Sequence, residues 1–323
     1  MKVFITGIAG MIGYHFSLHM KKRGHQVWGF DNFNDYYDPH LKQDRADLLE
    51  NHGIVVYRAD LMTANYALYL GAHSPDVVVH LAAHAGVRHS IEYPQLYIDN
   101  NITGTQKLVE ACEKYNCNNV IYASTSCVMH GQKLPWKEDH PLHHQKNPYG
   151  WSKQVNECQF LNSDIQRTAA VRFFTVYGPY GRPDMGLALF TDGIQNGKPI
   201  TVYNYGDMQR DFTYVEDICQ GVRLVAEKMM QEQDQRWDEI FNIGHGNPVQ
   251  LMEFIHEIER CLDKKALIDF QPIHPADSYK TWADISKIQK LGYQSTTPVS
   301  VGVATFVDWW LGYYSQYKPT CNQ

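Results

Sequence analysis

Apolar and polar residues alternate in blocks that predict strands and helices in turn up to about residue 175. After the first apolar run, Met11, Phe16 and Met20 recur at helical spacing, and Gly24 fits the end of that helix. This alternation predicts βαβ units around a parallel sheet. The apolar runs typical of buried parallel strands are Lys2–Thr6, Val27–Asp31, Ile54–Arg58, Val77–Ala83, Val120–Ser126 and Val171–Phe174.

Beyond about residue 175 the pattern is less regular and is interrupted by glycines and prolines. We predict a Rossmann-type, doubly wound α/β sheet with a smaller interleaved α/β domain. Residues 1–174 with a returning segment 210–243 form the first domain, and residues 175–209 and 244–323 form the second. Elements predicted in this part are the helices Leu187–Asn196, Tyr214–Met230, Val249–Leu262 and Val299–Tyr313 and the strands Ile200–Tyr203 and Glu239–Ile243.

Three glycines follow the first predicted strand with the spacing Gly7-x-x-Gly10-x-x-Gly13. Gly7 allows a tight turn, Gly10 lets the backbone approach a pyrophosphate, and Gly13 allows close packing of helix on strand. The phosphates then lie over the helix N-terminus. Asp31 ends the second strand, where an acid binds an adenosine ribose and repels a 2′-phosphate. Because no Arg follows before Arg45, the motif predicts NAD rather than NADP.

Small and polar residues follow two further predicted strands. Asp60 and Leu61 come after the third strand and are placed to face an adenine. Ala82, Ala83 and Ala85 come at the end of the fourth strand, where small side chains let a dinucleotide pass closely. Since ligands of open α/β sheets bind at the carboxyl ends of the strands, these residues extend the predicted cofactor site.

Tyr149 and Lys153 form a Tyr-x-x-x-Lys motif, and residues four apart share one face of a helix. A tyrosine titrates near pH ~10 in water, and a fixed cation beside it favours the phenolate and lowers its pKa. The pair therefore predicts a proton acceptor for a sugar or alcohol hydroxyl. Thr125 and Ser126 end the fifth strand, where they can hydrogen-bond that hydroxyl. Each feature also occurs without function, but together with the glycine motif they favour catalysis.

The composition limits the partners and the location of the chain. A net charge of −6 and a pI near 6.2 give no basic surface for nucleic acid. No apolar stretch approaches the ~20 residues needed to cross a bilayer, and a strand is predicted where a signal peptide would lie. Seven cysteines without a Cys-x-x-Cys pair fit reduced thiols. We expect a cytoplasmic protein without nucleic-acid or membrane partners.

The sixteen histidines do not predict a metal site. The pair His143-His144 lies in a polar loop between two prolines, where adjacent histidines are more often solvated than metal-bound. No carboxylate cluster at ligand spacing accompanies the pair.

These motifs resemble those of the extended short-chain dehydrogenases/reductases that act on nucleotide sugars. The resemblance spans nearly the whole chain and narrows to the UDP-glucuronate 4-epimerases, which interconvert UDP-glucuronate and UDP-galacturonate. Beyond the glycine motif, Ser124/Thr125 and Tyr149-x-x-x-Lys153, the similar stretches are Asp31–Asp38, Leu81–Arg88, Arg172–Met185 and Tyr203–Tyr214.

The resemblance implies a mechanism in which NAD stays bound. Tyr149 takes the proton from the sugar O4 while C4 gives hydride to the nicotinamide, and Thr125, with Ser126, holds O4. The 4-keto sugar then turns in the pocket and takes the hydride back on its other face. A pocket of this kind holds the UDP part of the sugar nucleotide firmly and the sugar loosely.

The resemblance also implies binding residues and a partner. Arg210 is implied to bind the diphosphate and Arg182 the uronate carboxylate, with Arg88 as a weaker candidate for that carboxylate. A homodimer is implied through the helices Gly104–Tyr115 and Tyr149–Phe160. Further implied contacts are Met11, Ile12, Asn32, Leu81, Asn101 and Ser124 for the cofactor, and Thr175, Met185, Val202, Tyr203 and Asp277 for the substrate.

The chain departs from related enzymes at a few positions. Cys127 follows Thr125-Ser126 where dehydratases and uronate decarboxylases carry an acid, which favours simple epimerisation. The run 128–131 (Val-Met-His-Gly) replaces Val-Tyr-Gly, and the helix after Lys153 is slightly shortened. Three alternatives stay open: a 4-epimerase of UDP-glucose and UDP-galactose or their N-acetyl forms, a UDP-glucuronate decarboxylase, and a catalytically silent NAD-binding relative.

Overall fold

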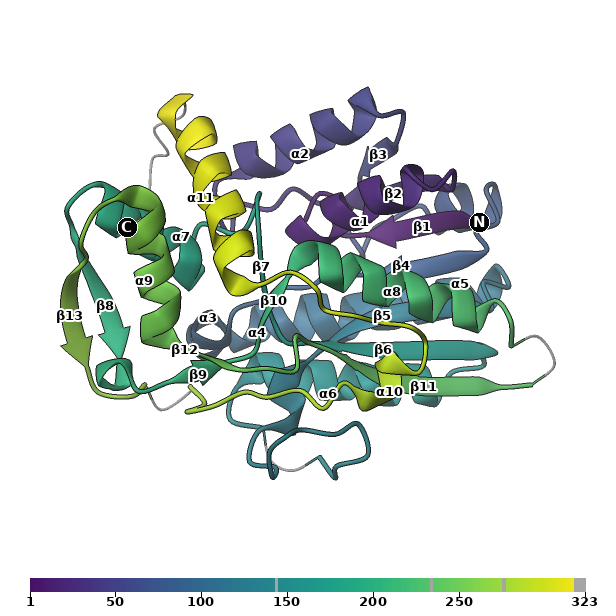
Figure 1. Ribbon diagram of the computed structural model, residues 1–323. Coiled ribbons are helices and arrows are strands. Elements are labelled where there is room, and N and C mark those ends of the chain that lie inside the picture. Colours follow the sequence, from purple (N-terminus) through teal and green to yellow (C-terminus); the bar gives the residue numbers. More distant parts are fainter. Residues whose placement is uncertain (143–144, 233–234, 275–276, 317–323) are drawn as a thin grey trace.

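A parallel sheet of seven strands forms the centre of the computed structural model, which describes residues 1–142, 145–232, 235–274 and 277–316 (Figure 1). The predicted Rossmann-type α/β fold is confirmed. The chain order reverses between the neighbours β1 and β4, which is where open α/β sheets bind ligands. From edge to edge the strands are β11 (Trp237–Ile243), β6 (Arg167–Phe173), β5 (Asn119–Thr125), β4 (Val77–His80), β1 (Lys2–Thr6), β2 (Gln26–Asp31) and β3 (Val55–Arg58).

Helices cover both faces of this sheet because successive strand residues point to opposite sides. In β1, Val3 and Ile5 pack into one apolar core and Phe4 packs into the other. The first core includes residues of α1 (Met11–Lys21), α2 (Pro39–Asn51) and α8 (Val215–Met229). The second includes residues of α5 (Gly104–Lys114), α6 (Pro148–Leu161) and the π-turn η1 (Ala67–Gly71).

A smaller group of elements lies beyond the carboxyl ends of the strands, at the left of Figure 1. It has an apolar core of its own, which includes Phe254, Val303 and Phe306. Its elements are the helices α7 (Gly186–Gln195), α9 (Leu251–Leu262) and α11 (Val299–Gln316) and the paired strands β8 (Pro199–Tyr203) with β13 (Leu267–Gln271).

Short elements connect the two groups and lie near the strand ends. Two further two-stranded pairs are β7 (Thr175–Tyr177) with β10 (Phe212–Tyr214) and β9 (Gln209–Arg210) with β12 (Val249–Gln250). The remaining helical turns are α3 (Val87–Glu92), α4 (Pro94–Tyr97), η2 (Ile98–Thr103), η3 (Ser126–Met129), η4 (Asn204–Gly206) and α10 (Ser286–Gln289).

Several predicted boundaries differ from the structure by one to four residues, and two of these differences have identifiable reasons. The fourth strand ends at His80 rather than Ala83, because Leu81 N and Ala82 N turn to bond the Thr6 carbonyl and hydroxyl. The helix predicted from Val249 begins at Leu251, since residues 249–250 pair with β9 instead. Within the described ranges, none of the helices has the length and apolar character that crossing a bilayer requires.

Candidate active site

The three glycines form a cradle at the turn between β1 and α1. Gly7 has φ +73°, and a Cβ there would lie 2.7 Å from Ala82 N. A Cβ on Gly13 would lie 2.3 Å from the Gly7 carbonyl oxygen, so α1 can approach β1 only with glycine at this position. Gly10 is the N-cap of α1 and offers no side-chain acceptor, which leaves the first backbone N–H groups open to an anion. This arrangement fits the pyrophosphate of a dinucleotide, with Met11 and Ile12 in the first turn.

The acid at the end of β2 lies beside the other predicted adenosine contacts. Asp31 is buried, and its Oδ1 accepts a hydrogen bond from Phe33 N at 2.9 Å. Asn32 Nδ2 donates to Asp60 Oδ2 at 2.8 Å, which joins the loops after β2 and β3. Leu61 is buried next in sequence to Asp60. The structure therefore brings these four predicted residues to one end of the site.

Sequence reasoning missed Lys42, a buried cation on α2 near Asp31. Its Nζ donates to the Asn34 carbonyl at 2.9 Å and to Asn34 Oδ1 at 2.7 Å. Burial lowers the pKa of Lys42, and the nearby Asp31 carboxylate opposes this decrease. In the sequence Lys42 is one of many polar residues of a single helix, so no sequence pattern distinguishes it.

We expect the protein to carry NAD rather than NADP, because the Asp31 carboxylate repels a 2′-phosphate. Release of the nucleotide by denaturation and its chromatographic identification check this expectation. The matched variant is Asp31→Asn, which retains the acceptor for Phe33 N but removes the charge. The preference of this variant for NAD over NADP should fall by about tenfold or more, because the variant lacks the repulsion between the Asp31 carboxylate and the 2′-phosphate of NADP. NADP recovered from the wild-type protein would contradict the assignment of Asp31.

Buried polar side chains hold the loop after β4 in place. Asn101 Oδ1 accepts from His84 N at 2.8 Å, and its Nδ2 donates to the His84 carbonyl at 3.0 Å and to Ser152 Oγ at 3.0 Å. The Asn101 amide is thus engaged with protein groups, and we expect it to position this loop. The predicted cofactor residues Leu81, Ala82, Ala83 and Ala85 all lie in this half-buried loop.

Behind the same loop, His80 connects two threonine hydroxyls, with Nδ1 2.7 Å from Thr6 Oγ1 and Nε2 2.9 Å from Thr105 Oγ1. Burial, together with the charge of Lys153, lowers the pKa of His80 to about 3. His80 is therefore neutral at physiological pH and ties β1, β4 and α5 together.

The candidate base meets the candidate hydroxyls where β5 and α6 converge. Asn147 caps α6 by accepting from Gly150 N at 2.8 Å, which places Tyr149 in the first turn. Thr125 ends β5, one residue before the predicted end of the strand, Ser126 begins η3, and both are buried. Burial raises the pKa of Tyr149 to about 12, whereas a hydrogen bond with Thr125 and the charge of Arg182 lower it. The structure thus brings together the phenol and the hydroxyl that the sequence predicted as catalytic partners.

In the protein chain alone the pKa of Tyr149 is raised, and the charge of Lys153 is not among the influences that shift it. The predicted role of Lys153 beside Tyr149 stays a prediction. Lys153 is only 2 % exposed, and burial lowers the pKa of Lys153 itself to about 8. No hydrogen bond from its ammonium to another residue is found within the described ranges. A buried ammonium without a protein acceptor, four residues from Tyr149 on α6, fits the ribose hydroxyls of a bound dinucleotide.

Four of the predicted substrate residues gather beyond the strand ends. Arg88 Nη2 lies 2.9 Å from Asp277 Oδ2, and the Arg88 guanidinium stacks 4.1 Å from the centre of the Tyr203 ring. Arg210 Nη1 donates to the carbonyls of Gln209 at 2.9 Å and of Tyr279 at 3.2 Å. Burial lowers the pKa of Arg210, and the Asp277 carboxylate opposes this. Two arginines beside one carboxylate leave a net positive charge, which suits a diphosphate.

The guanidinium of Arg182 already has a carboxylate partner. Nε and Nη2 donate to the two oxygens of Asp184 at 2.9 and 2.5 Å, and the Tyr36 hydroxyl donates to Asp184 at 3.0 Å. Burial opposes the charge of Arg182, but the hydrogen bonds and charge of Asp184 raise its pKa. A Cβ on Gly86 would lie 3.6 Å from Arg182 Nη2, so the fork faces the loop after β4. Sequence reasoning missed Asp184 and Tyr36.

The other predicted residues lie close by in less direct positions. Thr175 begins β7, and its N–H bonds the Asp211 carbonyl at 3.1 Å. Met185 is exposed at the start of α7. Val202 is fully buried in β8 and packs in the apolar core of the smaller group of elements. Ser124 turns away from the site and donates to Glu157 Oε1 at 2.5 Å.

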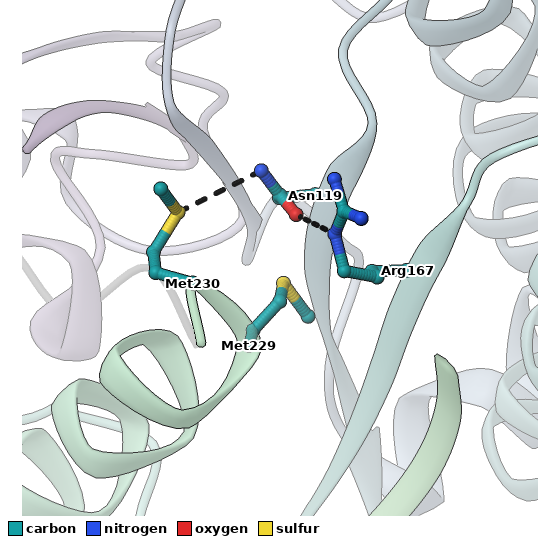
Figure 2. A pocket seen from close by; sticks show the side chains of 4 residues that line it. All are labelled: Asn119, Arg167, Met229 and Met230. Atoms are coloured by element: carbon teal, nitrogen blue, oxygen red, sulfur yellow. Dashed lines mark hydrogen bonds between the residues drawn. The ribbon is translucent and has the colours of Figure 1, made fainter. Parts of the chain in front are cut away.

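Two other kinds of candidate site are a surface hollow and a metal site. A small hollow lined by Asn119, Arg167, Met229 and Met230 lies at the amino ends of β5 and β6, the edge of the sheet opposite to Tyr149 (Figure 2). Among the described residues, no group of three or more His, Cys, Asp or Glu side chains is arranged to hold a metal ion. The pair His143-His144 lies outside the described residues.

The seven-stranded parallel sheet and the glycine turn between β1 and α1 are those of a dinucleotide-binding enzyme. The chain belongs to the NAD dependent epimerase/dehydratase family, whose model matches residues 3–244. Tyr149, Lys153 and Thr125 lie within the matched region.

Individual relatives narrow the similarity to one group of this family. The chain is 37 % identical to UDP-glucuronate 4-epimerase 3 of Arabidopsis thaliana, over 99 % of this chain and 79 % of the relative. It is 37 % identical to protein CapI of Staphylococcus aureus, over 98 % of this chain and 100 % of the relative. A solved structure of UDP-glucuronic acid 4-epimerase from Bacillus cereus, in complex with UDP-glucuronic acid and NAD, superposes with a TM-score of 0.87. The identity to that enzyme is 33 %, covering 96 % of this chain and 98 % of that chain.

Proposed function

We propose that this protein is an isomerase that epimerises a UDP-uronic acid at C4, converting UDP-glucuronate into UDP-galacturonate. The observation that carries the proposal is the Tyr149–Thr125 pair at the end of β5, with Lys153 on the same helix and Arg182 within electrostatic range. The superposition on the Bacillus cereus enzyme bound to UDP-glucuronic acid and NAD supports the same substrate and cofactor.

In this proposal each residue has a defined task. Tyr149 Oη takes the proton of the sugar O4 and later returns it, while Thr125 Oγ1 holds O4 within reach. Lys153 binds the ribose of the cofactor, and the open N–H groups at the start of α1 bind the pyrophosphate. NAD, when bound, supplies the hydride acceptor and donor at C4. Arg88 and Arg210 hold the diphosphate, and Arg182 faces the uronate carboxylate.

Cys127 separates this reaction from decarboxylation. It follows Thr125-Ser126 at the site, and burial raises the pKa of its thiol. A thiol that stays protonated is a weak acid–base group compared with a carboxylate at neutral pH. Proton transfer at C5 therefore lacks the carboxylate that the related decarboxylases carry in this position.

Incubation with UDP-glucuronate followed by chromatographic separation tests the function directly. We expect UDP-galacturonate as the product, without UDP-pentose or CO₂. Parallel reactions with UDP-glucose and UDP-N-acetylglucosamine serve as controls for the neutral-sugar alternative. Faster turnover of either neutral sugar, or a steady yield of UDP-xylose, would overturn the assignment.

The division into two domains extends this proposal. Residues 1–174 with 210–243 bind NAD, and residues 175–209 with 244–323 bind the nucleotide sugar. Separate apolar cores under α8 and under α11 support this division. A cytoplasmic location is supported by six cysteines in the described ranges, all of which are free thiols.

We further propose a homodimer formed by α5 and α6 of two copies. Trp151, Val155 and Cys158 recur at helical spacing on the part of α6 that the sheet does not bury, and Leu161 follows with 58 % exposure. Light scattering at micromolar concentration should therefore give the mass of two chains. Val155→Arg should give a monomer, whereas the control Leu267→Arg, on the exposed β13, should leave the dimer intact. A monomeric wild-type protein would count against this interface.

A further inference from the structure

A buried ion pair lies directly behind the candidate catalytic residues. Arg172 on β6 is 1 % exposed and Glu157 on α6 is 7 % exposed. Arg172 Nε donates to Glu157 Oε1 at 2.9 Å, and Nη2 donates to Oε2 at 2.8 Å. Glu157 Oε1 also accepts from Ser124 Oγ at 2.5 Å. The glutamate is thus held by three charge-assisted hydrogen bonds from two neighbouring strands.

The position of this pair connects both halves of the catalytic arrangement. Glu157 follows Tyr149 and Lys153 at further steps of four residues along α6. Ser124 directly precedes Thr125, and the register of β5 with β6 places Ser124 opposite Arg172. The pair therefore joins α6, which carries Tyr149, to β5, which carries Thr125, through Ser124 and the neighbouring strand β6.

A contribution to the stability of the fold does not explain why Glu157 and Arg172 form an ion pair in the protein interior. Moving a carboxylate and a guanidinium from water into the protein interior carries a large desolvation penalty. Replacing a buried ion pair by apolar residues of similar volume is therefore often neutral or stabilising. Apolar side chains pack without a preferred direction, whereas a bidentate Arg–carboxylate pair fixes both distance and angle. We therefore expect the ion pair to fix the position of α6 relative to β5 and β6.

We propose that Glu157 and Arg172 are positioning residues that fix α6 against β5 and thereby set the contact between Tyr149 Oη and Thr125 Oγ1. The inference rests on the proposed function of Tyr149 and Thr125. Arg172 extends the same framework, because its Nη1 donates to the Glu138 carbonyl at 3.2 Å and Glu138 Oε1 accepts from Asn242 N of β11 at 2.9 Å. The edge of the sheet next to the site is thus held by one continuous set of polar contacts.

The test is the double variant Glu157→Met/Arg172→Met, assayed as full-length protein loaded with NAD. Removing both charges leaves no unpaired ion, so the melting temperature should stay within a few degrees of wild type. We expect kcat to fall by about 10- to 100-fold with KM changed less than about threefold, because misplacement by about 1 Å costs this much. Ser124→Ala removes one of the three bonds and should reduce kcat less than the double variant does.

A matched control is Asp217→Asn, which weakens another buried carboxylate at the start of α8. Asp217 accepts from Ser295 Oγ at 3.0 Å and from Thr297 N at 3.2 Å, and it lies on a helix that packs on the other face of the sheet from α6. This variant should lose stability while kcat stays near wild type. A double variant that keeps wild-type kcat would overturn the inference, and so would a loss of activity that follows loss of bound NAD.

A second measurement separates this inference from the proposed function. Crystal structures of wild type and of the double variant give the separation of Tyr149 Oη and Thr125 Oγ1 without any turnover. A separation that lengthens beyond hydrogen-bond distance in the variant supports positioning, and an unchanged separation overturns it. A wild-type protein that turns over no UDP-uronate would refute the proposed function. The structural comparison would still test whether Glu157 and Arg172 position Tyr149 and Thr125.

Discussion

Replacing Tyr149 by Phe is expected to lower kcat for UDP-glucuronate by about 10²–10⁴-fold, the usual cost of removing a general base. The substitution deletes only the phenolic oxygen that we propose as the acceptor of the O4 proton, and with it the influence of Thr125 on that oxygen. The ring lies beside that of Tyr97, with centroids 6.2 Å apart, and this contact is retained. The bound NAD content of the purified protein should therefore match that of wild type.

The role of Tyr149 as a base also predicts how kcat/KM changes with pH. Burial raises the pKa of Tyr149 to about 12 in the chain alone, so without cofactor and substrate its phenol is mostly protonated at neutral pH. Wild-type kcat/KM should then increase with pH over the range in which Tyr149 loses its proton, and the residual rate of Tyr149→Phe should lack this increase. A variant rate within a few-fold of wild type would remove Tyr149 from the mechanism.

Replacing Arg182 by Ala is expected to lower kcat/KM for UDP-glucuronate by about 10- to 100-fold relative to UDP-glucose. A hydrogen bond to a charged group contributes about 1.5–3 kcal/mol, and only the uronate offers a carboxylate at this position. The larger cost of an unpaired buried charge does not apply in full, because Asp184 already balances Arg182 and its side chain is 18 % exposed. The measurement is kcat/KM for both sugars in wild type and variant.

Asp184→Asn provides the matched control for this charge. It keeps the shape of the side chain that orients the guanidinium but leaves Arg182 without a competing carboxylate. The preference for UDP-glucuronate over UDP-glucose should increase in this variant and decrease in Arg182→Ala. Equal losses for the two sugars in Arg182→Ala would show that Arg182 is structural, and Arg88 would then be the candidate for the carboxylate.

Features that depend only on neighbours along the chain could be predicted from the amino-acid sequence. The glycine motif needs only the turn from β1 into α1, and Asp31 needs only the end of β2. Tyr149 and Lys153 share a face because one turn of α6 separates them. Alternating strands and helices likewise indicated the parallel sheet, since connections of this kind favour that arrangement.

The contacts between residues far apart in the sequence, and the pKa values of the buried groups, became known only from the tertiary structure. Arg88 and Asp277 are paired across 189 positions, and Arg182 proved to be balanced by Asp184 and Tyr36. The pKa values of Tyr149 and Lys153 depend on burial, which no spacing along a helix reveals. Desolvation and the distances between charges are properties of the packed molecule, because both arise from elements that are far apart in the chain.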